Sequence, residues 1–258
     1  MDHIIAGIDI GSATSKVVIL REGGIVASSL IRTGADSADT AHRAMAMALK
    51  EIGLGLADLH YIVATGYGRI IVPFAHEIIT EIACHAKGTH FVFPHVRTIL
   101  DMGGQDCKAI RIDERGLHTS FAMNDKCAAG TGRFLEAMAR ALDLSIQELG
   151  PLSLQASESV AVSSMCAVFA KSEVTAMARR GIPQSTILAG LHEAIAERVH
   201  GLLKRVGIEP EFAISGGIAK NVGVVRKLEE RLGLKAHIAP EPQIMGALGA
   251  ALFAAERG

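Results

Sequence analysis

The chain has 258 residues, of which 49% are hydrophobic and 21% are charged, which is typical of a globular protein with a substantial core. Its 26 Lys and Arg residues are balanced by 27 Asp and Glu residues, which excludes a broad basic surface for nucleic acid or an anionic membrane. The N-terminus lacks a secretory signal pattern and the late apolar run 245–255 is too short to span a bilayer, so we expect a cytoplasmic protein.

The spacing of apolar residues predicts helices and strands that alternate along the chain. The predicted helices cover residues 41–52, 134–144, 173–180, 187–206 and 244–255. Strand-like runs occupy residues 61–64, 98–101 and 213–215. This order predicts a layered α/β architecture.

One sequence pattern occurs twice. Residues 8–20 and 100–112 both read apolar-Asp-x-Gly-x-x-x-x-Lys-apolar, with Asp9 or Asp101 at the end of a β-like run that precedes a tight turn. The duplication predicts two related lobes with a duplicated β-sheet core. We expect the first lobe to comprise residues 1–96 joined by a C-terminal helix at 244–258, and the second to comprise residues 97–243.

The two turns are suited to binding a nucleotide. Glycine and small hydroxyl residues let backbone N–H groups approach phosphate oxygens, so two such turns predict a phosphate clamp. Asp9 and Asp101 are hard oxygen ligands suited to Mg²⁺ held through its waters, and Gln105 is suited to positioning an attacking water. Gly216 and Gly217 follow an apolar strand, which favours a backbone platform beside an adenosine. P-loop and Gly-x-Gly-x-x-Gly motifs are absent from the sequence.

Two of the four cysteines, Cys127 and Cys166, each precede a helical pattern. A helix N-terminus stabilises a thiolate, so this placement predicts a thiolate-held metal centre. An iron–sulfur cubane normally takes four sulfurs, which a two-fold dimer would supply from two chains. The alternative is that the pair consists of small buried hydrophobic residues, the role that we expect for Cys84 and Cys107.

The sequence resembles a known class of ATPases. The two Asp-x-Gly turns and residues 215–217 resemble the actin, sugar-kinase and Hsp70 superfamily. Within it, segments 64–69, 101–106, 124–134 and 245–250 resemble the ATP-dependent activators (component A) of 2-hydroxyacyl-CoA dehydratases. That family also includes ATPase subunits of benzoyl-CoA reductase.

This resemblance implies a homodimer with one [4Fe–4S] cluster at its interface, ligated by Cys127 and Cys166 of both subunits. ATP hydrolysis would drive one low-potential electron into a partner dehydratase of the component D type, with reduced ferredoxin or flavodoxin as the donor. The implied catalytic residues are Gln105, Asp9 and Asp101, the two aspartates serving Mg²⁺. The implied ATP and ADP contacts are Ser12, Ala13, Thr14, Ser15, Lys16, Gly103, Gly104, Gln105, Asp106, Gly132, Gly216, Gly217, Lys220 and Gln243.

Other functions compete with this interpretation. An ATPase subunit of a benzoyl-CoA reductase-type complex would share all of these motifs. A sugar or acetate-type kinase would need a catalytic carboxylate in an insertion for which 258 residues leave little room. An Hsp70-like module would not need the cysteine pair, and a zinc-stapled dimeric ATPase would use the same four sulfurs without redox chemistry.

Overall fold

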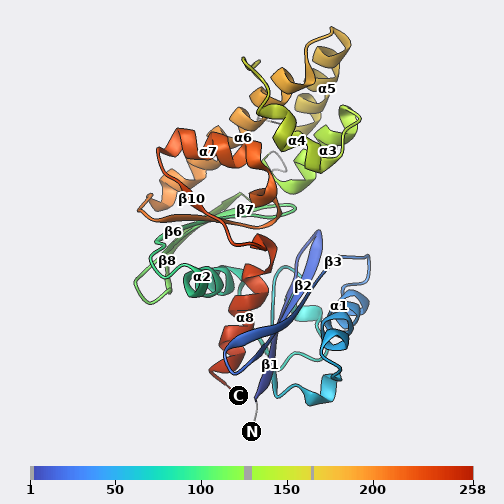
Figure 1. The fold of residues 1–258 in the computed structure, drawn as a ribbon, viewed down its shortest axis with the longest axis vertical. Coiled ribbons are helices and arrows are strands. Elements are labelled where there is room, and N and C mark those ends of the chain that lie inside the picture. The colour runs from blue at the N-terminus through green and yellow to red at the C-terminus, as the bar shows by residue number, and fades with distance from the viewer. Residues whose placement is uncertain (1–2, 125–129, 164–165, 258) are drawn as a thin grey trace. The chain divides into compact units, whose positions relative to one another are not determined.

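The computed structural model describes residues 3–124, 130–163 and 166–257 (Figure 1). The chain divides into two compact units. Unit 1 comprises Met1–Val96, Ile112–Thr119 and Ala239–Gly258, and unit 2 comprises Arg97–Arg111 and Ser120–Ile238. Two five-stranded sheets and their flanking helices confirm the α/β fold expected from the sequence.

The sheet of unit 1 has the strand order β3-β2-β1-β4-β5. Its strands are β1 (Ile4–Ile10), β2 (Thr14–Arg21), β3 (Gly24–Arg32), β4 (Tyr61–Thr65) and β5 (Glu77–Ile78). Strands β1 to β3 form an antiparallel meander, whereas β4 runs parallel to β1 and β5 runs parallel to β4. The carboxyl ends of β1 and β4 therefore meet at the same edge of the sheet.

Helices cover both faces of this sheet. Because side chains of a strand alternate between faces, Ile4, Ile8 and Ile10 of β1 pack in the cluster that contains helix α1 (Ser37–Glu51). Ile5 packs instead in the cluster that contains helix α8 (Met245–Ala255). Helix α8 also contacts α2 (Glu81–Val92), so the predicted C-terminal helix packs within unit 1.

The second sheet has the order β10-β9-β6-β7-β8. Its strands are β6 (Thr98–Met102), β7 (Cys107–Ile112), β8 (His118–Asn124), β9 (Phe212–Ser215) and β10 (Ala236–His237). Strand β6 pairs antiparallel with β7 and parallel with β9, which repeats the arrangement of β2, β1 and β4 in unit 1. The duplicated sequence pattern thus corresponds to a duplicated strand arrangement.

In the described part of unit 2, five helices pack together; Figure 1 labels them. They are α3 (Gly132–Ala141), α4 (Ile146–Ser153), α5 (Ala167–Arg179), α6 (Gln184–Val206) and α7 (Val222–Leu232). The central helix is α6, whose apolar side chains are largely buried among residues of α3, α4, α5 and α7. The described residues also form four short 3₁₀ segments, at Leu56–Asp58, Arg69–Ile71, Gly217–Lys220 and Pro242–Ile244.

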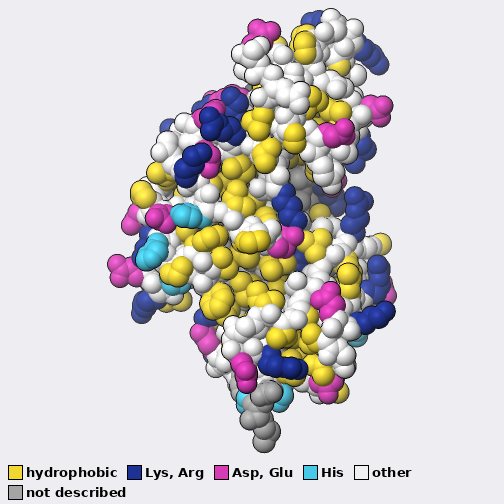
Figure 2. Space-filling model, viewed as in Figure 1, with side chains coloured by type: hydrophobic (Ala, Val, Ile, Leu, Met, Phe, Trp, Pro, Cys, Tyr) yellow, Lys and Arg dark blue, Asp and Glu magenta, His cyan; other side chains and the backbone are white. Residues whose placement is uncertain are grey.

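Charged side chains of both signs are interspersed on the face shown in Figure 2, where Lys and Arg lie beside Asp and Glu. This distribution agrees with the net charge of −1. In the part of the chain that the structure describes, no helix is both long enough and apolar enough to cross a bilayer.

Candidate functional site

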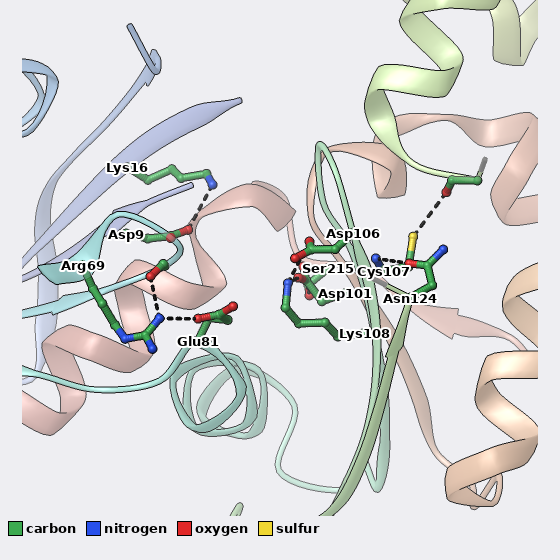
Figure 3. Close-up of polar contacts among 12 residues, drawn as sticks. Asp9, Lys16, Arg69, Glu81, Asp101, Asp106, Cys107, Lys108, Asn124 and Ser215 are labelled. Carbon is green, nitrogen blue, oxygen red and sulfur yellow. Dashed lines mark hydrogen bonds and ion pairs between the residues drawn. The ribbon is translucent and has the colours of Figure 1, made fainter. Parts of the chain in front are cut away.

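The first turn lies in unit 1, between β1 and β2. Asp9 and Lys16 are cross-strand partners, and the Lys16 Nζ lies 3.0 Å from Asp9 Oδ2 (Figure 3). Asp9 is only 4% exposed, so its charge is compensated mainly by this lysine. The backbone N–H of Gly11 donates to the Thr14 carbonyl across the turn, at 3.1 Å.

The remaining residues assigned to this turn differ in exposure. Ser12, Ala13 and Thr14 are partly exposed at the turn. Ser15 is completely buried, and its hydroxyl is hydrogen-bonded to Thr33 Oγ1 at 2.9 Å. The Thr33 hydroxyl in turn donates to the Gly11 carbonyl, at 2.7 Å. Ser15 therefore supports the turn from inside, together with Thr33, which the sequence interpretation did not include.

The second turn lies in unit 2, between β6 and β7, and repeats the charge pair. Asp101 and Lys108 are cross-strand partners, and the Lys108 Nζ lies 3.7 Å from Asp101 Oδ2 (Figure 3). The same amine lies 2.8 Å from Asp106 Oδ1. Lys108 is only 4% exposed and connects two carboxylates of the candidate site. It was missed as a site residue, although the repeated pattern contains it.

Each aspartate also faces a glycine at the end of the neighbouring parallel strand. Gly66 follows β4 with φ +88, and a Cβ there would lie 2.2 Å from Asp9 Oδ1. Gly216 follows β9 with φ +85, and a Cβ there would lie 2.9 Å from Asp101 Oδ1. Both the left-handed backbone and the close carboxylate require glycine. The duplication therefore extends beyond the two turns to a third strand in each unit.

These surroundings fit Mg²⁺ bound through water. Asp9 and Asp101 are both 4% exposed and both hydrogen-bonded or ion-paired, Asp101 with the Ser215 hydroxyl at 3.1 Å as well as with Lys108. Little of either carboxylate surface is exposed for direct coordination of a metal ion, but hydrogen bonds to the waters of a hydrated Mg²⁺ need less exposed surface. Among the residues that the structure describes, no group of three or more His, Cys, Asp or Glu is arranged to hold a metal ion.

Gln105 is exposed at the tip of the second turn. With its amide oriented to satisfy its neighbours, Gln105 Oε1 accepts hydrogen bonds from Arg133 Nη1 and Nη2, at 2.7 and 2.9 Å. The turn is also joined to α3 through the backbone, because the Gly132 N–H donates to the Gly103 carbonyl at 3.0 Å. The two residues Gln105 and Gly132, both assigned to nucleotide binding, are thus held in one local network.

The other assigned contacts are distributed between the units. Gly217 and Lys220 are exposed on the 3₁₀ segment that follows Gly216, in unit 2. Gln243 is partly exposed in the segment before α8, in unit 1, where its N–H donates to Glu241 Oε1 at 3.1 Å.

Cys166 is the N-cap residue of α5 and is partly exposed. Hydrogen bonds from the backbone N–H groups of Phe169 and Val168 lower the pKa of its thiol from the usual value. Such a thiol ionises readily and is a good metal ligand, so this residue fits a place in a thiolate-held cluster. Cys127 lies outside the described residues.

The two remaining cysteines have a different environment. Cys84 in α2 is completely buried, and burial raises the pKa of its thiol to about 12. Cys107 at the start of β7 is also completely buried, and burial likewise raises its pKa. Both side chains are therefore protonated at neutral pH, in agreement with the packing role expected from the sequence.

Each unit thus places a buried aspartate at the end of the first strand of a strand–turn–strand pair. A ROK family glucokinase from Streptomyces griseus shares this fold at a TM-score of 0.60 and 12% identity, covering 98% of this chain and 99% of that one. At this identity the likeness shows the fold alone. The chain belongs to the BadF/BadG/BcrA/BcrD ATPase family, because the sequence model of that family matches residues 6–254.

Two relatives are similar over nearly the whole chain. The activator of lactoyl-CoA dehydratase from Anaerotignum propionicum is 49% identical over 251 residues, which are 97% of this chain and 96% of that protein. The structure of the activator of the 2-hydroxyisocaproyl-CoA dehydratase from Clostridium difficile with bound ADPNP matches at a TM-score of 0.94. It is 41% identical, and the match covers 98% of this chain and 95% of that one.

Proposed function

We propose that this chain is an ATP-hydrolysing one-electron donor that reduces, and so activates, a partner 2-hydroxyacyl-CoA dehydratase. The observation that carries the proposal is the position of Cys166 at the N-terminus of α5, where backbone N–H groups favour its thiolate. The ATPase family and the dehydratase activators among the relatives support the same conclusion. In this proposal residues 1–96 with 244–258 form one ATPase lobe, and residues 97–243 form the lobe that carries the thiolates.

The proposed metal ligands are Cys127 and Cys166 from each of two identical subunits. A [4Fe–4S] cluster bound by these four sulfurs supplies one-electron redox chemistry at low potential. Val168 and Phe169, in the first turn of α5 next to Cys166, are 71% and 70% exposed. Exposed apolar side chains of this size beside the ligand support a subunit interface at this position.

The proposed nucleotide chemistry depends on the two turns. Lys16 and the backbone of both turns bind the phosphates, and Asp9 and Asp101 bind the waters of Mg²⁺. Gln105 orients the attacking water, and it does not accept a proton because an amide is not a base near neutral pH. The hydrogen bonds from Arg133 to Gln105 support this role, because they hold the side chain at the tip of the turn.

The proposed partner is a component D type dehydratase, and the proposed electron donor is a reduced ferredoxin or flavodoxin. The relatives described above are dehydratase activators, which favours a dehydratase over a benzoyl-CoA reductase-type complex. A zinc-stapled ATPase remains the alternative that shares all four sulfurs, and it predicts no redox activity.

Anaerobic purification tests the proposal. We expect a dimer that contains iron and sulfide, has the visible absorbance of an iron–sulfur cluster and hydrolyses ATP. Cys127→Ser and Cys166→Ser should each lose the iron, because each substitution removes two of the four thiolates. The matched control is Cys84→Ala, which changes a buried core thiol and should retain the iron. A colourless zinc protein, or full iron retention in both serine variants, would refute the assignment.

A further inference from the structure

The side chain of Asp9 lies on the face of its sheet that helix α8 covers. Ile5 of β1 packs in the cluster that contains α8. Asp9 is four residues further along β1, and residues separated by an even number lie on the same face of a strand. Thr65, which pairs with Asp9 across the parallel strands, is completely buried on this face. The Asp9 carboxylate therefore enters the layer between the sheet and its helices.

The start of α8 packs closely against β1 and α2, because glycines remove the side chains that would separate them. A Cβ on Gly7 of β1 would lie 2.1 Å from the Ala247 carbonyl oxygen. A Cβ on Gly88 of α2 would lie 2.1 Å from the Met245 carbonyl oxygen. A larger residue at either position would push the backbone of α8 away. The first turn of α8 is therefore held close to both elements within unit 1.

Gly246 in this first turn faces Asp9 and a histidine of α2. A Cβ at residue 246 would lie 2.9 Å from His85 Nε2 and 3.2 Å from Asp9 Oδ2. The same carboxylate oxygen lies 3.0 Å from Lys16 Nζ (Figure 3). His85 is only 6% exposed. The imidazole nitrogen and the carboxylate oxygen thus converge on space that any side chain at position 246 would fill.

Two polar atoms that converge in this way are suited to a bound water. The waters on a divalent cation are strong hydrogen-bond donors. A carboxylate oxygen accepts from them, and so does one nitrogen of a neutral imidazole. We propose that His85 is a further residue of the Mg²⁺ site, where it binds a water of the hydrated ion together with Asp9. Direct coordination by the imidazole is not part of the proposal, because Mg²⁺ prefers oxygen ligands and retains its waters.

This proposal rests on the proposed function, which assigns Mg²⁺ to Asp9 and Asp101. Calorimetric titration of the anaerobically purified protein with ADP tests it, at a series of Mg²⁺ concentrations and in EDTA without Mg²⁺. In EDTA, His85→Leu should bind ADP as the wild type does. The Mg²⁺ concentration that gives half of the gain in ADP affinity should rise about tenfold, the size expected for one lost hydrogen bond to a charged group.

Two further variants serve as controls. His85→Gln keeps a polar group near the position of Nε2 and should restore nearly the Mg²⁺ dependence of the wild type. His90→Leu makes the same substitution on the same helix, where the ring lies beside Gly116, and a Cβ there would lie 2.7 Å from His90 Nδ1. The Nε2 atom of His90 makes no hydrogen bond to any described residue. His90→Leu should therefore leave the Mg²⁺ dependence unchanged.

A purely structural role of His85 would give a different result. If the imidazole only packs, His85→Leu changes ADP affinity equally with and without Mg²⁺, or not at all, and either result would overturn the proposal. Gly246→Ala decides the question if His85→Leu does not fold, because its methyl group fills the space of the water and alanine favours a helix. It should also raise the Mg²⁺ requirement, and an unchanged requirement would count against the proposal.

The proposed function is judged separately, by the iron content and ATPase activity of the unmodified dimer. If that dimer contains iron and hydrolyses ATP, and His85→Leu keeps the Mg²⁺ dependence of the wild type, only the role of His85 is lost. A wild-type ADP affinity that does not change with Mg²⁺ would remove the ion from both Asp9 and His85.

Discussion

His192 connects three helices of unit 2 through a chain of buried hydrogen bonds. The oxygen of Asn221 is occupied by backbone N–H groups at the start of α7, so its amide nitrogen faces His192 Nε2, at 3.3 Å. His192 Nε2 is therefore the acceptor, and Nδ1 carries the proton toward Ser153 Oγ, at 2.9 Å. The Ser153 hydroxyl donates to the Gly150 carbonyl, at 2.7 Å. This hydrogen-bond network is complete only when the imidazole of His192 is neutral.

The effect of acid on this hydrogen-bond network follows from the pKa of His192. Burial, together with the positive charge of Lys227, lowers the pKa of His192 from 6.5 to about 4. The unfolded chain thus binds a proton below pH 6.5, but the folded chain does not until about pH 4. Stability is fully present above the unfolded pKa and is lost as the pH falls through this window. The difference in pKa corresponds to a loss of about 3 kcal/mol.

Urea unfolding of the wild type and of His192→Gln between about pH 7 and about pH 4 measures this term. Glutamine keeps one donor and one acceptor but does not titrate. Acidic groups and His200, whose pKa burial also lowers, are common to both proteins and cancel in the difference. We expect the wild type to lose about 3 kcal/mol more than the variant over this range. Parallel curves for the two proteins would refute the reasoning.

Two further predictions concern the turns. Gln105→Ala should slow ATP hydrolysis and leave ATP affinity nearly unchanged, whereas Asp9→Ala or Asp101→Ala should weaken Mg²⁺-dependent nucleotide binding itself. Turnover measurements and calorimetric titration of ATP separate the two effects. Unchanged turnover in Gln105→Ala would remove Gln105 from the mechanism. Lys108→Met should destabilise unit 2 by about 3 kcal/mol, because it leaves the buried Asp101 carboxylate and Asp106 without their shared cation. Chemical denaturation checks this value, and an unchanged midpoint would show that the lysine does not stabilise the pair.

The fold was predictable where apolar periodicity was strong. The predicted helices at 187–206 and 244–255 correspond closely to α6 and α8, because both have long, continuous apolar faces. The prediction at 173–180 covered only the second half of α5, which begins at Ala167, directly after Cys166, as the helical pattern following that cysteine indicated. Val168 and Phe169 in the first turn are exposed, so the buried face of this helix starts only at Ala170.

The candidate site was only partly predictable. The sequence repeat located Asp9 and Asp101, and the structure shows a lysine beside each of them. The pairing of each aspartate with a glycine on a third strand was not visible, because Gly66 and Gly216 lie far from their partners in sequence and are brought close by parallel strand pairing. The hydrogen bonds that Cys107 donates to Asn124 Oδ1 and to the Gly130 carbonyl were missed for the same reason.

The three described cysteines show how one residue type acquires different chemistry from its surroundings. Cys84 and Cys107 have no exposed surface, and for both the loss of hydration opposes ionisation more than any nearby charge favours it. Cys166 is partly exposed at a helix N-terminus, and the nearby backbone N–H groups of Phe169 and Val168 lower the pKa of its thiol, so its thiolate is favoured. A cysteine that binds a metal must be a thiolate, whereas a cysteine that donates a hydrogen bond must keep its proton. The same physical difference therefore separates Cys166, the proposed ligand, from Cys84 and Cys107, whose thiols stay protonated in the core.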